Sequence, residues 1–392
     1  MLGIGAEEYH ERQAAMRRLA ARSGLEGVVA WSRGGSAQDR YADVYHLTGC
    51  YQHQPFLPDV QGRWQARGHA AVVLPVDGPA LLLTDSAAVG EPPPAAPLRT
   101  APDLVAAVAE HLRGAVRPGR VGLVGGAAMA APWWCRLRSV LPAHELVAAD
   151  ELGWAARRVK SAAELRLLRA SGALGGQATG AAWAAAVPGA TEAEVAAAAV
   201  AEIVRAGGAY YGMGISSGAR SHTYAACDPA PYRAGRRLSA GDLLRFDLYG
   251  SVHGYLFGLA RTWVVGAEPT TEQRRLLAAV RDSALAGIEA ARPGQRVGEM
   301  ARRCQEVFER SEFAAHHGLP PQGQAGPWGH GLGLSFEPPW VSCEGPGAGE
   351  RIEAGMCLVL GHRIAIPSVG GAAYQDGVIV TDSGPEIITP GL

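Results

Sequence analysis

The sequence predicts a two-domain protein that mixes helices and strands, of the α/β (α+β) class. Helical stretches with apolar residues three and four positions apart alternate with short apolar runs that are typical of buried strands. The chain has 392 residues, of which 48% are hydrophobic and 19% are charged, enough for two hydrophobic cores. The change in pattern near 148–160 places the boundary, so we expect one domain in residues 1–150 and another in 151–392.

The first half begins with an amphipathic helix, Glu7–Arg22, followed by a short buried strand, Gly27–Trp31. Asp77-Gly78 lies between two apolar runs, which is a strong hairpin signal. The elements expected after Trp31 are the hairpin strands Ala70–Leu74 and Ala80–Thr84, the helix Leu104–Leu112, the strand Val121–Val124 and the helix Trp133–Leu141.

The second half begins with two alanine-rich helices, Ser161–Ala185 and Thr191–Arg205. Glu192 and Glu194 lie in the first turn of the second helix, where carboxylates favour the helix dipole. The elements expected after it are strands at Leu243–Leu248, Leu256–Val265, Met356–Leu360 and Gly377–Val380, with helices at Thr271–Ala291 and Val297–Ser311.

The composition excludes several classes of partner. A net charge of −1 gives no general attraction for nucleic acid or an anionic membrane. No run approaches the ~20 apolar residues of a membrane span, and no signal-peptide pattern begins the sequence, so we expect a cytoplasmic protein. Six scattered cysteines without a C-x-x-C pair favour reduced thiols. Lys160 is the only lysine.

Six motifs occur in the order typical of one enzyme family. They are Lys160-Ser161-x-x-Glu164, Pro188-Gly189-x-Thr191-Glu192, Gly241-Asp242-x-x-x-x-Asp247, Arg261-Thr262 with the strand that follows, Gly329-His330-Gly331-Leu332-Gly333-Leu334, and Gly355-Met356 followed by Ile366-Pro367-x-Val369-Gly370-Gly371. Together they resemble the creatinase/aminopeptidase P/methionine aminopeptidase family. The resemblance implies a pita-bread C-terminal domain preceded by a creatinase-like N-terminal α/β domain.

The resemblance also implies where metal ligands would lie. Metal-dependent members use two Asp, one His and two Glu. The first Asp falls on Asp247 and the His on His330, whereas the other three positions fall on Gly258, Gly361 and Gln375. Two hard cations need bridging carboxylates to offset a charge of about +4. We therefore expect no metal and no other cofactor, with a metal bound by Asp247, His330 and an unrecognised third ligand as the alternative.

Three residues are the candidates for catalysis. His222 follows a Ser-Gly element that resembles the segment carrying a substrate-binding histidine in the family, although a surface loop explains it equally well. His330 can hydrogen-bond Asp247, which would fix its tautomer and raise its pKa. The alternative is a satisfied buried His–Asp pair.

Further residues are candidates for substrate binding. Arg363 can clamp a carboxylate bidentately, and Arg220 can do so from the other side, with exposed salt bridges as the alternative. Arg261, by contrast, is more structural than catalytic in the family motif. The remaining candidates are Tyr224, Glu337, which shifts or replaces a pocket histidine of the family, His362, and Gln375. His53 and Arg63 are further candidates, because the resemblance implies a homodimer in which this region reaches the partner's active site.

Three functional classes follow. The first is a metal-independent, creatinase-like enzyme that uses histidine acid–base chemistry on a C–N bond of a small polar, carboxylated substrate. The second is a lyase, isomerase or cyclase acting on a specialised metabolite, and the third is a non-catalytic binding module. A metallo-aminopeptidase is the least favoured enzyme.

Overall fold

The chain divides into two compact units, one ending at Arg158 and the other beginning at Val159. This division comes from a computed structural model, which describes residues 3–34, 38–53, 68–86, 95–223, 229–316, 328–366 and 368–391. The helix α5 (Asp150–Arg157) belongs to the first unit, so the division lies beyond the boundary expected after residue 150.

The first unit contains a six-stranded mixed sheet in the order β4-β3-β2-β1-β5-β6. Its central strand β1 (Gly27–Arg33) pairs antiparallel with β2 (His69–Pro75) and parallel with β5 (Gly119–Val124). The antiparallel pairing of β2 with β3 (Leu81–Thr84) confirms the expected hairpin. The other elements of this sheet and its helices are β4 (Leu98–Thr100), β6 (His144–Ala148), α1 (Ala6–Arg22), η1 (Gln38–Tyr41), α2 (Ala42–Thr48), α3 (Leu104–Ala115), η2 (Gly126–Ala128) and α4 (Ala131–Ser139).

Alternate residues of β1 enter different cores. Val29 and Trp31 pack in one hydrophobic cluster, and Val28 and Ala30 pack in another. Because side chains alternate along a strand, both faces of this sheet are covered by apolar layers.

The second unit contains an eight-stranded sheet whose main path runs β11-β10-β12-β13-β9-β8-β7, with β14 paired to β13. The strands are β7 (Ala209–Ser217), β8 (Leu243–Val252), β9 (Tyr255–Val264), β10 (Gly329–Leu332), β11 (Phe336–Val341), β12 (Cys357–Ile366), β13 (Gly370–Thr381) and β14 (Gly384–Ile387). The helices are α6 (Ala162–Ala185), α7 (Glu192–Arg205), α8 (Thr271–Ala290) and α9 (Val297–Glu309), with short 3-10 turns η3 (Gly218–Arg220) and η4 (Ala314–His316).

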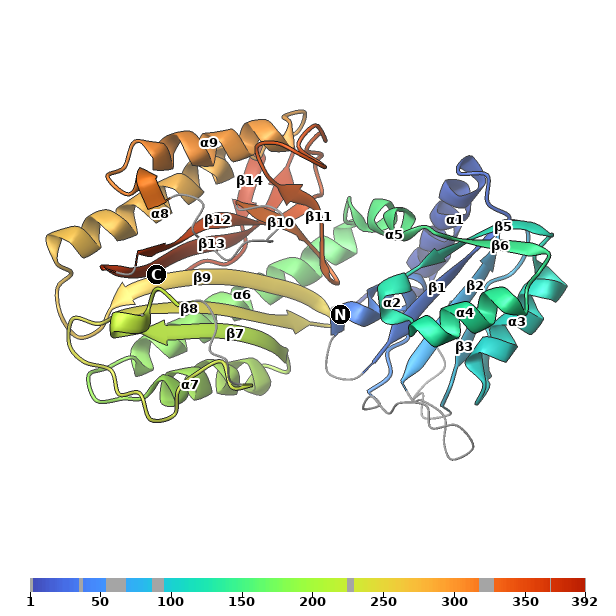
Figure 1. Cartoon of the computed structure of the whole chain (residues 1–392), viewed down its shortest axis with the longest axis horizontal. Coiled ribbons are helices and arrows are strands. Elements are labelled where there is room, and N and C mark those ends of the chain that lie inside the picture. Colours follow the sequence, from blue (N-terminus) through green and yellow to red (C-terminus); the bar gives the residue numbers. More distant parts are fainter. Residues whose placement is uncertain are drawn as a thin grey trace. The chain divides into compact units, whose positions relative to one another are not determined.

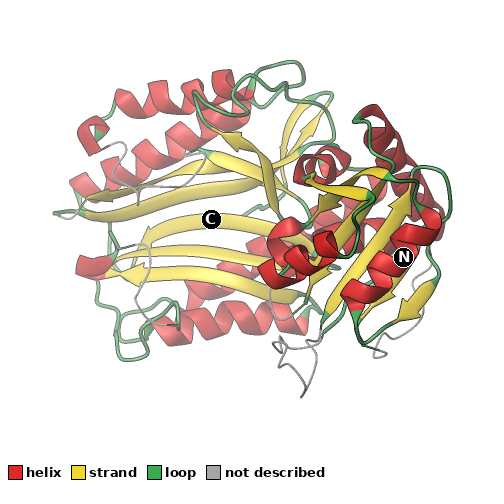
Figure 2. Cartoon of the chain, turned by 45° about the vertical axis from the view of Figure 1, so that its right-hand side comes forward, coloured by secondary structure: helices red, strands yellow, loops and turns green. Residues whose placement is uncertain are grey.

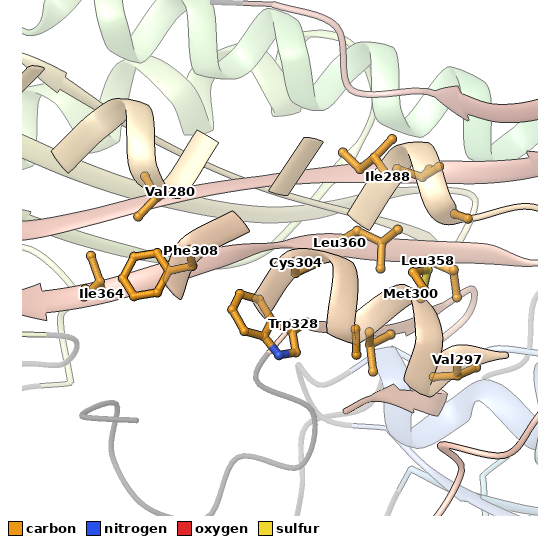
Figure 3. Packing of buried hydrophobic residues seen from close by; sticks show 14 of the residues in the cluster. Val280, Ile288, Val297, Met300, Cys304, Phe308, Trp328, Leu358, Leu360 and Ile364 are labelled. Atoms are coloured by element: carbon orange, nitrogen blue, oxygen red, sulfur yellow. The ribbon is translucent and has the colours of Figure 1, made fainter. Parts of the chain in front are cut away.

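Two helix pairs back this sheet (Figures 1 and 2). The helices α6 and α7 pack on the half formed by β7, β8 and β9, and α8 and α9 pack on the half formed by β12 and β13. Figure 3 shows the second of these cores, in which Phe308 and Trp328 lie beside Leu360 and Ile364. This arrangement is the pita-bread layout that the sequence predicted.

The second face of the sheet, which we call the inner face, is not packed by α6–α9 in the described part of the chain. In β8, Leu244, Phe246 and Leu248 enter the core under α6 and α7, so Arg245, Asp247 and Tyr249 point the other way. The same alternation along the paired strands puts Gly258, Ala260, Val359, Gly361, Arg363 and Gln375 on the inner face.

None of the helices in the described ranges has both the length and the apolar character that crossing a membrane would require.

Candidate functional site

Neighbouring strands bring the family's ligand positions together on the inner face. Asp247 pairs with Ala260, Ala260 with Gln375, and Gln375 with Gly361, so these positions follow one another across four strands. His330 pairs with Val359, two residues from Gly361. The sheet register therefore assembles one site from β8, β13, β12 and β10.

Asp247 is completely buried beside a guanidinium. The Nε atom of Arg245 lies 3.7 Å from an Asp247 carboxylate oxygen, and Arg245 also donates a hydrogen bond of 2.9 Å to the Thr223 carbonyl. Within the described part of the chain, neither carboxylate oxygen of Asp247 has a hydrogen-bond partner. A buried carboxylate is costly unless a positive charge lies near it, and Arg245 supplies that charge.

The expectation that His330 hydrogen-bonds Asp247 and has a raised pKa is wrong, because its ring bonds the neighbouring backbone and burial lowers its pKa. Its Nδ1 atom lies 2.9 Å from the Gly331 carbonyl oxygen, and because a carbonyl can only accept, Nδ1 carries the proton. Burial, together with the nearby Arg363 guanidinium, lowers the pKa of His330 to about 4. At neutral pH the Nε2 atom therefore has a lone pair that can accept a hydrogen bond.

The Arg363 side chain contacts Gln375, which stands at one of the lost ligand positions. It donates a hydrogen bond of 2.5 Å to the Gln375 side-chain oxygen, and it is close enough to His330 to affect the pKa of that imidazole. Arg363 is half-buried, which holds a cation at a fixed place on the inner face.

Three aromatic rings, those of Tyr211, Tyr249 and Phe336, form what we call the aromatic wall. The Phe336 ring centroid lies 5.6 Å from that of Tyr211 and 5.4 Å from that of Tyr249, in edge contacts. Phe336 also contacts the His330 ring at 4.9 Å. The wall therefore joins β7 and β8 to the strands β10 and β11 on the other half of the sheet.

Neighbouring atoms occupy the space that a side chain at Gly258 or Gly361 would need. A Cβ atom at Gly258 would lie 3.1 Å from the Tyr249 ring. A Cβ atom at Gly361 would overlap the Tyr374 carbonyl oxygen and lie 2.5 Å from the Gln375 Cα atom. Among the residues that the structure describes, no three His, Cys, Asp or Glu side chains gather as a metal-binding group. These residues do not fit the family's pair of metal ions.

His222 lies between two residues that are hydrogen-bonded to the sheet. Ser221 receives a 3.0 Å hydrogen bond from the Gly371 backbone, and Arg245 binds the Thr223 carbonyl, so this segment is tied across β8 and β13. The neighbouring Arg220 is exposed. Tyr224 lies outside the described residues.

Two predicted binding residues point away from the inner face. Glu337 is buried and accepts a 2.8 Å hydrogen bond from the Lys160 ammonium. The His362 ring packs against Phe308 and Trp328 in the core under α9, with ring centroids 4.2 and 4.5 Å away. The structure therefore brings together Asp247, His330, Arg363 and Gln375 but separates Glu337 and His362 from them.

Two candidates for substrate binding, His53 and Arg63, belong to the first unit. The His53 ring is in edge contact with that of Tyr51, with centroids 4.7 Å apart. Arg63 lies outside the described ranges. Their role at a partner's site stays a prediction.

The sequence reasoning missed Arg245, Tyr249 and Phe336. Arg245 and Tyr249 stand two residues on either side of Asp247, and side chains at that spacing share a strand face. This periodicity could have found both. Phe336 lies on β11, and the pairing of β11 with β10 shifts register between His330 and Gly331. No local sequence pattern predicts this shift.

Comparison with known proteins identifies the relatives. The model of "Metallopeptidase family M24" matches residues 166–382. An Xaa-Pro dipeptidase of Pyrococcus furiosus is 29% identical over 178 residues, 45% of this chain and 46% of the relative. A putative dipeptidase of Bacillus subtilis, YkvY, is 26% identical over 65% of this chain and 66% of its own length. The first of these alignments spans about half the length of the relative.

Solved structures agree over almost the whole chain. Dipeptidase PepE from Mycobacterium ulcerans superimposes with a TM-score of 0.76 at 25% identity, covering 99% of this chain and 97% of that one. The prolidase of Pyrococcus horikoshii gives a TM-score of 0.75 at 18% identity, covering 97% and 99%. The two-domain fold is therefore that of prolidase-like proteins.

These relatives correct one expectation. The chain was expected to be a metal-independent, creatinase-like enzyme, but the matching family is one of metallopeptidases, and the relatives carry the names prolidase, Xaa-Pro dipeptidase and peptidase. The expectation was wrong because it took the lost ligands as a sign of another substrate class. The loss of metal ligands shows which side chains are missing, but it does not indicate which substrate the protein binds.

Proposed function

The chain belongs to metallopeptidase family M24, and from that premise we propose that it hydrolyses the amide bond of a short peptide with a free carboxylate. The observation that carries the proposal is the Arg363 guanidinium, bonded to Gln375 on the face that gathers the family's ligand positions. The names of the relatives, Xaa-Pro dipeptidase and dipeptidase, support a substrate of this length.

The charges of the inner face suit such a substrate. Arg363 brings a guanidinium to the same face as the neutral His330. A planar guanidinium holds a carboxylate with two parallel hydrogen bonds. Arg363 therefore has the chemistry to bind a substrate carboxylate.

The neighbouring groups suit the amide. The Nε2 atom of His330 can accept a hydrogen bond from a substrate N–H or from water.

The test is a product assay. The purified chain is incubated with dipeptides ending in proline or in other residues, after dialysis against a chelator and with Mn²⁺, Co²⁺ or Zn²⁺ added back, and the free amino acids are measured by mass spectrometry. We expect release of both amino acids with uptake of one water. A wild-type protein that cleaves none of these dipeptides under any of the conditions overturns the proposal.

Arg363 has its own prediction. Arg363→Met should lower kcat/KM for a dipeptide by roughly 10- to 100-fold, because a hydrogen bond to a charged group contributes about 1.5–3 kcal/mol. The dipeptide amide, which lacks the carboxylate, should already be a poor substrate and should lose little more. Arg303→Met, an exposed arginine on α9, is the matched control. Equal loss on the acid and the amide would rule out carboxylate binding by Arg363.

A further inference from the structure

We infer that the aromatic wall is the surface that selects the substrate side chain, and that Phe336 is its main specificity-determining residue. The inference rests on the proposed function and adds the chemical class of the side chain, which is apolar. The wall consists of Tyr211, Tyr249 and Phe336.

The exposure of these rings separates them from the core. Phe246, Phe257 and Phe308 are fully buried under the helices, whereas Tyr211, Tyr249 and Phe336 are each only half-buried. When an apolar group covers apolar surface that is in contact with water, the free energy of the system falls. The wall is thus an apolar surface that a substrate side chain can still cover.

The position of the wall ties it to the site. Phe336 contacts the His330 ring at 4.9 Å, and His330 lies near Arg363. Tyr249 stands two residues after Asp247, and its ring lies against Gly258, in the place where the family carries a carboxylate. A substrate residue next to a carboxylate held at Arg363 would therefore meet aromatic carbon at the position to which the family resemblance assigns a carboxylate.

Phe336 is the ring that contacts both of the other rings of the aromatic wall. It makes edge contacts with Tyr211 at an interplanar angle of 89° and with Tyr249 at 76°, so it carries the wall from one half of the sheet to the other. Removing it would break the wall in the middle. One methylene group of contact in an apolar pocket already changes discrimination by roughly tenfold or more.

The experiment compares two dipeptides, one with leucine and one with glycine beside the same C-terminal residue. Wild type should favour the leucine dipeptide in kcat/KM. Phe336→Ala should lower this preference, the ratio of the two kcat/KM values, by about tenfold or more. Phe336→Leu, which keeps apolar bulk, should retain most of it, and Tyr249→Phe should retain all of it if the ring rather than the hydroxyl matters.

Tyr210→Ala is the matched control, because Tyr210 is an exposed ring on the same strand as Tyr211 but outside the wall. Circular dichroism of each variant verifies folding. A wild type that cleaves both dipeptides, with an unchanged ratio in Phe336→Ala, overturns this inference but keeps the proposed function. A wild type that cleaves neither overturns the proposed function.

Discussion

Gly361 occupies a point where β12 and β13 leave no room for a side chain. A Cβ atom there would overlap the Tyr374 carbonyl, which belongs to the backbone of the paired strand. At Gly258 the nearest atoms are those of the Tyr249 side chain, 3.1 Å away. The two lost ligand positions are therefore closed in different ways, one by backbone and one by a ring that can move.

This difference predicts two different costs. Gly361→Ala should destabilise the C-terminal unit by about 1–3 kcal/mol, because overpacking against backbone forces the strands apart. Gly258→Ala should cost less, because the Tyr249 ring can rotate away. Urea unfolding followed by circular dichroism measures both. A Gly258→Ala variant as unstable as Gly361→Ala would mean that the ring is as rigid as the strand.

At the scale of elements, the start of α6 is tied to β11 by a buried ion pair. Lys160 donates to Glu337 at 2.8 Å, and the side chains are 2% and 1% exposed. Ser161, the next residue, caps α6 through a reciprocal capping box with Glu164. The Lys160–Glu337 pair therefore links the N-terminus of α6 to β11, the strand that also carries Phe336.

Breaking one side of this pair should be costly. Lys160→Met removes the cation that faces the buried Glu337 carboxylate, so we expect a loss of about 3–5 kcal/mol in unfolding free energy. The double variant Lys160→Met with Glu337→Gln should recover much of that loss, since no buried charge remains. Chemical denaturation of the two single variants and the double variant completes the cycle, and strictly additive losses would contradict the coupling.

The long periodic elements of this fold could be predicted from the sequence. The helices α1, α6, α7, α8 and α9 and the β2–β3 hairpin follow from apolar spacing and turn residues. The strand β7, with its glycines at positions 212 and 214, and the three-residue β4 carry too little apolar pattern to be recognised. Their pairing is imposed by neighbouring strands rather than by their own sequence.

At the scale of the whole molecule, the candidate site was only partly predictable. Asp247 and His330 could be located through motifs, and Arg363 and Gln375 through their spacing from those motifs. The separation of His362 from the site follows from strand alternation, but the Lys160–Glu337 pair joins residues 177 positions apart. A contact of that separation depends on tertiary structure that no local pattern reports.

The cysteines of both units allow a test of the whole fold. Burial raises the pKa of Cys50 to about 11, and of Cys304 and Cys357 to about 12, whereas Cys135 is exposed. The thiolate is the reactive form, and a raised pKa keeps these three thiols protonated at pH 8. Maleimide labelling followed by peptide mapping should modify Cys135 at least about tenfold faster than the other three. Equal labelling of the four would contradict the packing of both cores.

The single lysine gives the molecule one further property. Its ε-amine is the only side-chain amine in the chain, and it is enclosed with Glu337. Acylating reagents that need an accessible, unprotonated amine should modify it only when the segment around β11 opens. The rate of that one chemical event, followed by the mass of a single peptide, would time the opening of the C-terminal unit without any introduced label.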